Sequence, residues 1–244
     1  MRRPLAVALV ALCLGCRSAE PARPAAPTPP PASFPSALHW VRNSAEYRAI
    51  ALQSYRLAGE EIEKAARGRE AGSWAVILDA DETVLDNSGY EKELFEQRAK
   101  HTPERWAEWV RRKSAPAVPG APAFLRRVRG LGGRIAFVSN RTEAECPDTA
   151  ATLEARGMAG DAVLCRPPDQ RDKRARFEKV ASGEAFPDGK PVEVLMWVGD
   201  NINDFPGMSQ ASRKGPDDAF AAFGTRYFAL PNPVYGSWEE NARE

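Results

Sequence analysis

Three short segments of the sequence place carboxylate, hydroxyl and amide side chains directly after apolar runs. These segments are Asp79-Ala80-Asp81-Glu82-Thr83, Ser139-Asn140-Arg141 and Gly199-Asp200-Asn201, the last followed by Asp204. A single Asp in such a position is more often a helix cap or a turn residue than a ligand. Together, however, Asp79, Asp81 and Asp200 form an all-oxygen set of the kind that Mg²⁺ prefers. The pattern therefore predicts a divalent-metal site.

The apolar runs that precede these segments have the length and composition of buried strands. Strands are predicted at 74–78, 134–139, 162–165 and 192–198, and helices near 43–66, 120–131, 143–156 and 171–181. This alternation predicts an α/β fold with a Rossmann-like, mainly parallel sheet flanked by helices. Ligands bind beyond the carboxyl ends of such strands, so we expect the three segments to converge at one edge of the sheet.

Residues 88–119 form an insertion after the first predicted strand, and we expect a small helical cap there. Trp106 and Trp109 lie three residues apart in this insertion, a spacing more typical of a packed core than of a ligand platform. Tyr90 and Tyr235 lie nearer to the motif residues. They are the better candidates for stacking against a base or another aromatic ring of a substrate.

The composition argues against several classes of function. The chain of 244 residues has 34 Lys and Arg against 33 Asp and Glu, a formal charge of +1, so it offers no broad attraction for a nucleic acid polymer. Because His39 and His101 are the only two histidines, carboxylates must supply most of the acid, base or metal chemistry. The 43% hydrophobic and 27% charged residues are typical of a globular protein with a sizeable core.

The first fifteen residues have the pattern of an export signal. Arg2 and Arg3 precede an apolar run over 5–14, which is too short to span a bilayer comfortably. The run ends at Cys13-Leu14-Gly15-Cys16, which resembles a bacterial lipobox, although Cys13 stands where leucine is usual. We expect residues 1–15 to be a lipoprotein signal peptide and Cys16 to be lipidated. The alternative is ordinary secretory cleavage nearby.

A Pro- and Ala-rich segment over 16–36 follows, with a composition that favours extended, solvated chain. We interpret it as a tether between a lipid anchor and a folded domain over 37–244. Arg17 stands where an aspartate would signal retention in the inner membrane of enteric bacteria. The sequence therefore predicts an exported bacterial lipoprotein of the outer membrane, with its folded domain outside the cytoplasm.

Two cysteines remain after the predicted processing, Cys146 and Cys165. Cys146 would follow one strand and Cys165 would end the next, so both would lie at the same edge of a parallel sheet. An exported protein permits a disulfide between them, but buried free cysteines are also common. The sequence leaves both alternatives open, and it also leaves open the oligomeric state, a homo-oligomer included.

The sequence resembles the haloacid dehalogenase superfamily, whose phosphatases carry D-x-D-x-T, a strand-end Ser or Thr, a Lys and a late acidic motif. The resemblance is closer to the class C acid phosphatases, bacterial lipoproteins of the 5′-nucleotidase type, and it runs from about residue 39 to about residue 238. It rests on Ser44-Ala45-Glu46-Tyr47, Asp81-Glu82-Thr83-Val84-Leu85-Asp86-Asn87-Ser88, Trp106 with Trp109, Val138-Ser139-Asn140-Arg141, and Leu230-Pro231-Asn232 with Tyr235-Gly236. Ala80 departs from the commoner Leu or Ile.

The resemblance implies a phosphomonoesterase in which two carboxylates carry out the chemistry. Asp79 is expected to attack phosphorus and form an aspartyl-phosphate. Asp81 is expected to protonate the leaving oxygen and then to activate water. The backbone carbonyl of Asp81 would also bind the metal, so this residue would have two roles.

The same resemblance implies Mg²⁺ as the cofactor, held by Asp79, Asp81 and Asp200. Thr83 and Asp204 would orient these ligands. Ser139, Asn140 and Lys173 would hold the phosphate oxygens, with Lys173 chosen from a stretch that also contains Arg171, Arg174, Arg176 and Lys179.

The implied substrates are small phosphate monoesters, in particular nucleoside monophosphates. Two other readings remain. One is a lipid-anchored ligand-binding or storage-type protein with little activity, against which the intact Asp79 argues. The other is a phosphotransferase that passes the phosphoryl group to an alcohol.

Overall fold

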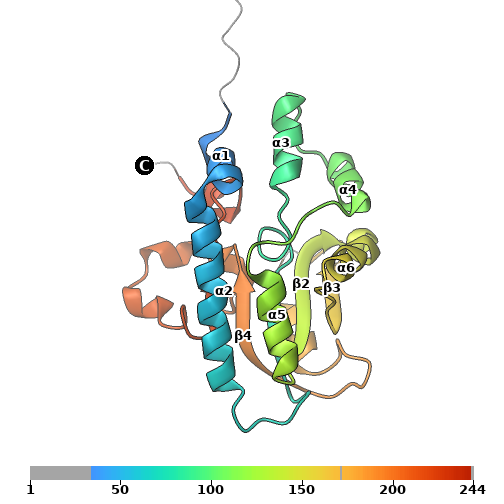
Figure 1. Ribbon diagram of the computed structural model, residues 1–244, viewed down its shortest axis with the longest axis vertical. Helices are drawn as coiled ribbons and strands as arrows, with labels where there is room; N and C mark the ends of the chain where they lie inside the picture. The colour runs from blue at the N-terminus through green and yellow to red at the C-terminus, as the bar shows by residue number, and fades with distance from the viewer. Residues whose placement is uncertain (1–33, 171, 243–244) are drawn as a thin grey trace, which may run out of the picture. The chain divides into compact units, whose positions relative to one another are not determined.

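The computed structural model describes residues 34–170 and 172–242 (Figure 1). The predicted signal peptide, the predicted lipidation site at Cys16 and nearly all of the predicted tether lie outside the described residues.

The centre of the fold is a five-stranded sheet in which every pair of neighbouring strands is parallel. The strands are β1 (Trp74–Leu78), β2 (Arg134–Thr142), β3 (Ala162–Arg166), β4 (Glu193–Gly199) and β5 (Tyr227–Ala229), in the order β3-β2-β1-β4-β5. This confirms the predicted parallel α/β fold, and the first four strands lie where the sequence placed them. The fifth strand was not predicted, because three residues are too few to show a periodic pattern.

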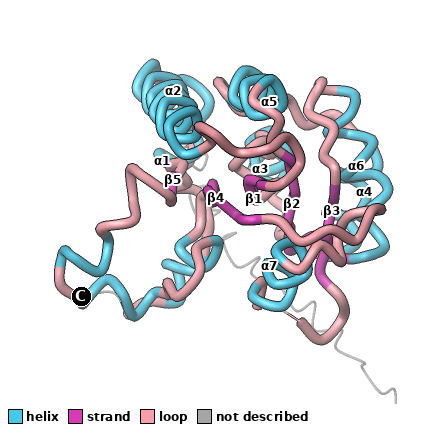
Figure 2. The backbone as a smooth tube through the Cα atoms, turned by 90° about the horizontal axis from the view of Figure 1, so that it is seen from below, coloured by secondary structure: helices cyan, strands magenta, loops and turns pink. Residues whose placement is uncertain are grey.

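Helices alternate with these strands along the chain. They are α1 (Ser36–Asn43), α2 (Ala45–Ala65), α3 (Ser88–Glu96), α4 (Pro103–Arg112), α5 (Ala121–Gly130), α6 (Cys146–Ala155) and α7 (Arg174–Ala181). Figure 2 shows α2 and α5 over one face of the sheet and α7 over the other. The helix predicted over 43–66 is α2, which begins at Ala45 because the Ser44 side chain accepts a hydrogen bond from the Tyr47 N–H and so caps it. The short helix α1 before it was not predicted.

Both faces of the central strand are buried, which explains why it reads as a continuous apolar run. Trp74, Val76 and Leu78 pack in the cluster that includes α2 and α5. Ala75 and Ile77 pack in the opposite cluster, which includes Phe177 of α7 and Phe205. The strand ends are thus held rigidly from both sides.

Helix α2 contacts the sheet through a narrow stripe of small and aromatic residues, including Ala51, Tyr55 and Ala58. Ile50 and Leu57 of the same helix are apolar but are 39% and 38% exposed. They lie seven residues apart on one side of the buried stripe, so they pack only partly against the domain.

The insertion over 88–119 contains α3 and α4, which lie beyond the carboxyl ends of the strands (Figure 1). Thr102 caps α4 by accepting a hydrogen bond from the Arg105 N–H, and Pro103 occupies its first turn. The helix ends at Lys113, which has a left-handed φ of 52°. The insertion is therefore a helical cap, as the sequence indicated.

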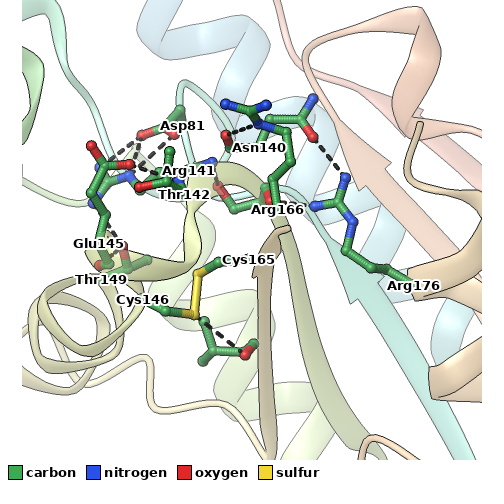
Figure 3. Close-up of a disulfide and its surroundings, with 12 residues drawn as sticks. Asp81, Asn140, Arg141, Thr142, Glu145, Cys146, Thr149, Cys165, Arg166 and Arg176 are labelled. Carbon is green, nitrogen blue, oxygen red and sulfur yellow. Dashed lines mark hydrogen bonds and ion pairs between the residues drawn. A yellow bond between two sulfur atoms is a disulfide. The ribbon is translucent and has the colours of Figure 1, made fainter. Parts of the chain in front are cut away.

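A disulfide joins Cys146 to Cys165, with their Cα atoms 5.7 Å apart. It connects the first residue of α6 to β3, directly below the loop that follows β2 (Figure 3). The sequence left open whether these cysteines are free or form a disulfide, and the structure shows the disulfide.

Across the described residues, every helix falls short of the length and apolar character needed to cross a bilayer.

Candidate active site

Three carboxylates converge at the carboxyl ends of β1 and β4. Asp79 follows β1 directly, Asp200 follows β4, and Asp204 ends a short 3₁₀ turn over Ile202–Asp204. One oxygen of each lies within 4.8 Å of the others. Such a set of hard oxygen ligands fits a divalent cation of the Mg²⁺ type.

The electrostatics of this cluster also fit a bound cation. Burial raises the pKa of Asp79 to about 7, although the neighbouring Lys173 acts in the opposite direction. Burial raises the pKa of Asp200 well above its usual range, and the carboxylates of Asp204 and Asp79 raise it further. Keeping both carboxylates ionised in this buried site therefore costs free energy, and a bound divalent cation would offset that cost.

Lys173 supplies positive charge at the centre of the cluster. Its Nζ forms ion pairs with Asp79 and with Asp204, the latter at 2.7 Å, and its side chain is 4% exposed. Burial alone would lower the pKa of Lys173, but Asp204 and Asp79 raise it above the usual value, so the ammonium group stays charged. Among the described basic residues of this stretch, Lys173 is the one that pairs with Asp79 and Asp204, and its contact with phosphate stays a prediction.

Asp200 and Asp204 are held by neighbours from three loops. Asp200 accepts hydrogen bonds from Thr83 Oγ1 at 3.2 Å and from Asn232 Nδ2 at 2.8 Å. Asp204 accepts one from the Asn201 N–H at 2.9 Å. A Cβ atom at Gly199 would overlap the Asp204 side chain, so only glycine allows this close approach.

The Asp81 carboxylate lies outside this cluster and faces the carboxyl-terminal end of β2. It accepts hydrogen bonds from Arg141 Nη2 at 2.7 Å and from Asn87 Nδ2 at 2.8 Å. Figure 3 shows Arg141 reaching Asp81 from this end of the strand. Arg141 is itself buried and donates a further hydrogen bond to Thr149 of α6 at 3.2 Å.

The residues predicted to bind phosphate differ in their access to solvent. Asn140 is exposed, and Arg176 Nη2 donates to its Oδ1 at 2.7 Å, which leaves the Asn140 amide N–H₂ as a donor (Figure 3). Ser139 is fully buried, and its Oγ accepts a hydrogen bond from the Arg141 N–H at 3.1 Å. Asn140 is therefore the more accessible of the two.

A cavity of about 610 Å³ opens onto Asp79 and Asp81. Aromatic side chains of the cap line one part of it, where Tyr90 OH lies 2.9 Å from His101 Nδ1 and the Tyr90 and Trp106 ring centroids are 5.2 Å apart. Its lining residues are Asp79, Asp81, Tyr90, Glu91, His101, Trp106, Asn140, Arg141, Asp200, Asn201, Val234, Tyr235 and Glu239.

This arrangement of strand-end carboxylates, a buried lysine and a helical cap agrees with a known protein family. The model of the HAD superfamily, subfamily IIIB (acid phosphatase), matches residues 25–238. The chain belongs to this family. The predicted recognition as a haloacid dehalogenase-type acid phosphatase is thereby confirmed.

Solved structures of this family show the same fold. The class C acid phosphatase from Bacillus anthracis, one of whose solved structures has tungstate bound, is 29% identical. It superposes with a TM-score of 0.73, and the match covers 83% of this chain and 85% of that one.

Two curated plant proteins are also similar in sequence. The stem 28 kDa glycoprotein of Glycine max is 27% identical over 161 residues, which is 65% of this chain and 58% of the relative. The stem 31 kDa glycoprotein of the same plant is 27% identical over 159 residues, 64% of this chain and 50% of the relative. The matches thus span 58% and 50% of the length of these two relatives.

Most of the residues predicted for the acid phosphatase site do come together. Asp79, Asp200 and Asp204 cluster around Lys173, and Asp81, Asn140, Tyr90 and Tyr235 line the adjacent cavity. Among the described residues, Ser139 does not line that cavity. The carboxylate of Asp81 is not among the three that converge, so a metal contact from this residue, through its backbone carbonyl, stays a prediction.

Several residues that shape the site received no role from the sequence. Asn87 and Arg141 hold Asp81, and Asn232 holds Asp200. All three residues lie inside the motifs that carry the family resemblance. Membership of those motifs was the signal in the sequence that could have identified them. Trp109 is buried, as the spacing predicted for a core residue, whereas Trp106, on the same side of α4, lines the cavity.

Proposed function

We propose that the protein is a Mg²⁺-dependent acid phosphatase that hydrolyses phosphate monoesters through an aspartyl-phosphate on Asp79, with nucleoside monophosphates as substrates. The observation that carries this proposal is the position of Asp79. Its carboxylate lies at the cavity, paired with the buried Lys173 and grouped with Asp200 and Asp204. Tungstate, bound in the Bacillus anthracis relative, is a tetrahedral oxyanion like phosphate.

The roles of the side chains follow from the bonds that must form and break. An oxygen of Asp79 bonds to phosphorus while the bond to the leaving oxygen breaks, and that oxygen keeps the electron pair and takes a proton from Asp81. A water oxygen then bonds to phosphorus, Asp81 takes a proton from that water, and the Asp79 carboxylate departs. We propose that Lys173, Asn140 and Ser139 hold the phosphate oxygens. This is supported by the pairing of Lys173 with Asp79 and by the position of Asn140 at the cavity.

The ligands that we propose for Mg²⁺ are Asp79 and Asp200, with the backbone carbonyl of Asp81. Asp204 and Thr83 keep Lys173 and Asp200 in place. When bound, Mg²⁺ supplies positive charge against the carboxylates and the phosphate oxygens.

The proposal of nucleotide substrates is supported by the cap side of the cavity. Tyr90 and Trp106 from the cap and Tyr235 from the C-terminal loop line a volume adjacent to Asp81. Aromatic rings in such positions can stack against the base of a nucleotide whose phosphate lies at Asp79.

We further propose that the protein is exported and anchored by a lipid on Cys16, after removal of residues 1–15. The Pro- and Ala-rich residues 16–36 would tether the domain over 37–244 to the outer membrane. The Cys146–Cys165 disulfide supports export, because disulfides persist mainly outside the cytoplasm.

Phosphate release is the test of this function. Mature protein and the Asp79→Asn variant are assayed with a nucleoside monophosphate panel and an aryl phosphate, each with and without Mg²⁺. We expect Mg²⁺-dependent release by the wild type and none by the variant. No turnover of any phosphomonoester would instead favour the binding or storage reading. Product formation in excess of released phosphate, with an alcohol present, would favour phosphotransfer.

A further inference from the structure

Asn87 is a fully buried residue whose polar atoms all have partners close to the site. It lies between the loop after β1 and helix α3. Its backbone N–H donates to Glu82 Oε1 at 2.7 Å, and its Nδ2 donates to Asp81 Oδ1 at 2.8 Å. Its Oδ1 accepts from Trp109 Nε1 at 2.8 Å. Asn87 therefore links the Asp81 carboxylate to helix α4 of the cap.

The Trp109 indole decides which end of the Asn87 amide faces Asp81. An indole N–H can only donate a hydrogen bond, so the amide oxygen must face Trp109. Arg141 Nη2 also approaches this oxygen, at 3.4 Å. The amide N–H₂ is thereby directed to the Asp81 carboxylate, which can only accept when ionised.

The contacts to the two oxygens of Asp81 are unequal. Oδ1 accepts from Asn87 Nδ2 at 2.8 Å, from Arg141 Nη2 at 2.7 Å and from Arg141 Nε at 3.0 Å. Within the described part of the chain, Oδ2 accepts only from Arg141 Nε, at 3.2 Å. Oδ1 is therefore saturated, and Oδ2 is the oxygen with capacity left for a proton.

We propose that Asn87, oriented by Trp109, is a positioning residue that holds Asp81 so that Oδ2 transfers the proton to the leaving oxygen. This inference rests on the proposed function. The proton leaves Oδ2 as the bond between phosphorus and the leaving oxygen breaks, and the electron pair of that bond stays on the leaving oxygen. In the second half of the reaction, Oδ2 takes a proton from the attacking water.

Helix α4 gives this arrangement a second contact with the site. The Arg141 guanidinium carbon lies 5.4 Å from the centre of the Trp106 ring, and Trp106 is on the same helix as Trp109. The cap thus contacts both residues that donate to the Asp81 carboxylate. Loss of either contact would loosen the proton donor while leaving Asp79 and Lys173 in place.

The dependence of rate on the leaving group tests this proposal. A nitrophenolate leaves without needing a proton, whereas an unsubstituted phenol or a nucleoside alcohol needs one. We would measure kcat/KM for these phosphate esters, because this constant reports the steps up to formation of the aspartyl-phosphate. The variant is Trp109→Phe, which removes the N–H and keeps an aromatic ring. The control is Trp74→Phe, because Trp74 is equally buried but its Nε1 has no partner among the described residues.

In Trp109→Phe, we expect kcat/KM for the nucleoside and phenyl esters to fall roughly tenfold, while that for the nitrophenyl ester changes little. For Trp74→Phe, kcat/KM should show no such difference between esters, even though this substitution also lowers the melting temperature of the protein. Asn87→Ala should give the same selective loss, and a larger one.

A uniform loss across all esters in Trp109→Phe would overturn the proposal, since it would indicate a purely structural role. Unchanged rates on every ester would also overturn it. If Asn87→Ala fails to fold, the comparison of Trp109→Phe with Trp74→Phe alone decides. If the wild type turns over none of these esters, the proposed function and this inference fail together. If the wild type is active but Trp109→Phe shows no selective loss, the inference alone fails.

Discussion

At the scale of single residues, the charge balance of the site depends on Lys173. Asp79 and Asp204 both pair with its ammonium group, which is almost completely buried. Removing one partner from a buried ion pair leaves an uncompensated charge, which is strongly destabilising. Lys173 therefore holds these two carboxylates together, and we propose that it also binds phosphate oxygens.

Replacing Lys173 by methionine should reduce kcat/KM on the order of a hundredfold, because one preorganised positive group is lost at the phosphate. The free energy of unfolding should fall by about 3 kcal/mol, since Asp79 and Asp204 lose their common partner. Lys179→Met in α7, the helix that follows Lys173 directly, is the matched control, because Lys179 is half exposed and, among the described residues, pairs only with Glu184. Equal effects of the two substitutions on turnover would refute the role of Lys173.

The raised pKa of Asp79 predicts that metal binding depends on pH. Burial raises this pKa to about 7, so between about 4 and 7 the metal-free folded protein keeps a proton that the unfolded chain releases. Stability without metal should therefore fall as pH rises through this range. Mg²⁺ must displace that proton at low pH, so it should raise the melting temperature more above pH 7 than below it. Thermal unfolding with and without Mg²⁺ at several pH values measures this difference. A Mg²⁺-induced rise in melting temperature that does not depend on pH would contradict the prediction.

At the scale of elements, contacts from neighbouring elements hold the carboxyl-terminal end of β2. The disulfide ties Cys146 of α6 to Cys165 of β3 (Figure 3). The next residue, Arg166, donates from Nε to the Asn140 carbonyl at 3.2 Å, and Arg176 of α7 donates to the Asn140 side chain at 2.7 Å. The end of β2 that presents Asn140 and Arg141 is therefore fixed by α6, β3 and α7.

Loss of the disulfide should lower the stability of the domain. The two cysteines are 19 residues apart, for which chain-entropy arguments give about 3 kcal/mol. The Cys146→Ser, Cys165→Ser double variant should lose this amount in urea unfolding, and reduced wild-type protein should match it. A wild type whose unfolding midpoint does not change on reduction would show that the bridge contributes nothing.

At the scale of the whole molecule, the architecture was readable from the sequence because the three central strands, β1, β2 and β4, are buried on both faces over most of their length. Residues 74–78 form a continuous apolar run that ends at an Asp, and the strand has those bounds. In a parallel sheet the carboxyl ends share one edge, so Asp79 and Asp200 had to lie near each other. The short β5 escaped prediction, because it is defined by its pairing with β4 rather than by a pattern of its own.

The contacts that orient the site could not be read from the sequence. Arg141 lies 60 residues from Asp81, and Trp109 lies 22 residues from Asn87. Such pairings depend on how the cap packs against the rest of the site and on how the end of β2 approaches Asp81. No local periodicity in the sequence encodes these contacts. Likewise, the choice of Lys173 among neighbouring basic residues rested on the family resemblance, and its burial between two carboxylates gives the physical reason.

The proposed membrane anchor predicts where the full chain will be found when it is produced in a bacterium. Wild-type protein should incorporate a labelled fatty acid and sediment with the outer membrane. Cys16→Ser should abolish the label and release the protein, whereas Cys13→Ser, the matched control, should remain labelled. Labelling that persists in Cys16→Ser would place the modification elsewhere and contradict the proposed processing.

The most direct test of the central claim is to trap the phosphoryl group on the enzyme. Protein quenched during turnover and treated with borohydride should contain homoserine in place of aspartate at position 79, because borohydride reduces an acyl-phosphate and leaves free carboxylates intact. The account predicts this conversion at Asp79 only when substrate and Mg²⁺ are present. Rapid turnover with position 79 unmodified, or with another carboxylate converted, would contradict the assignment of Asp79 as the nucleophile.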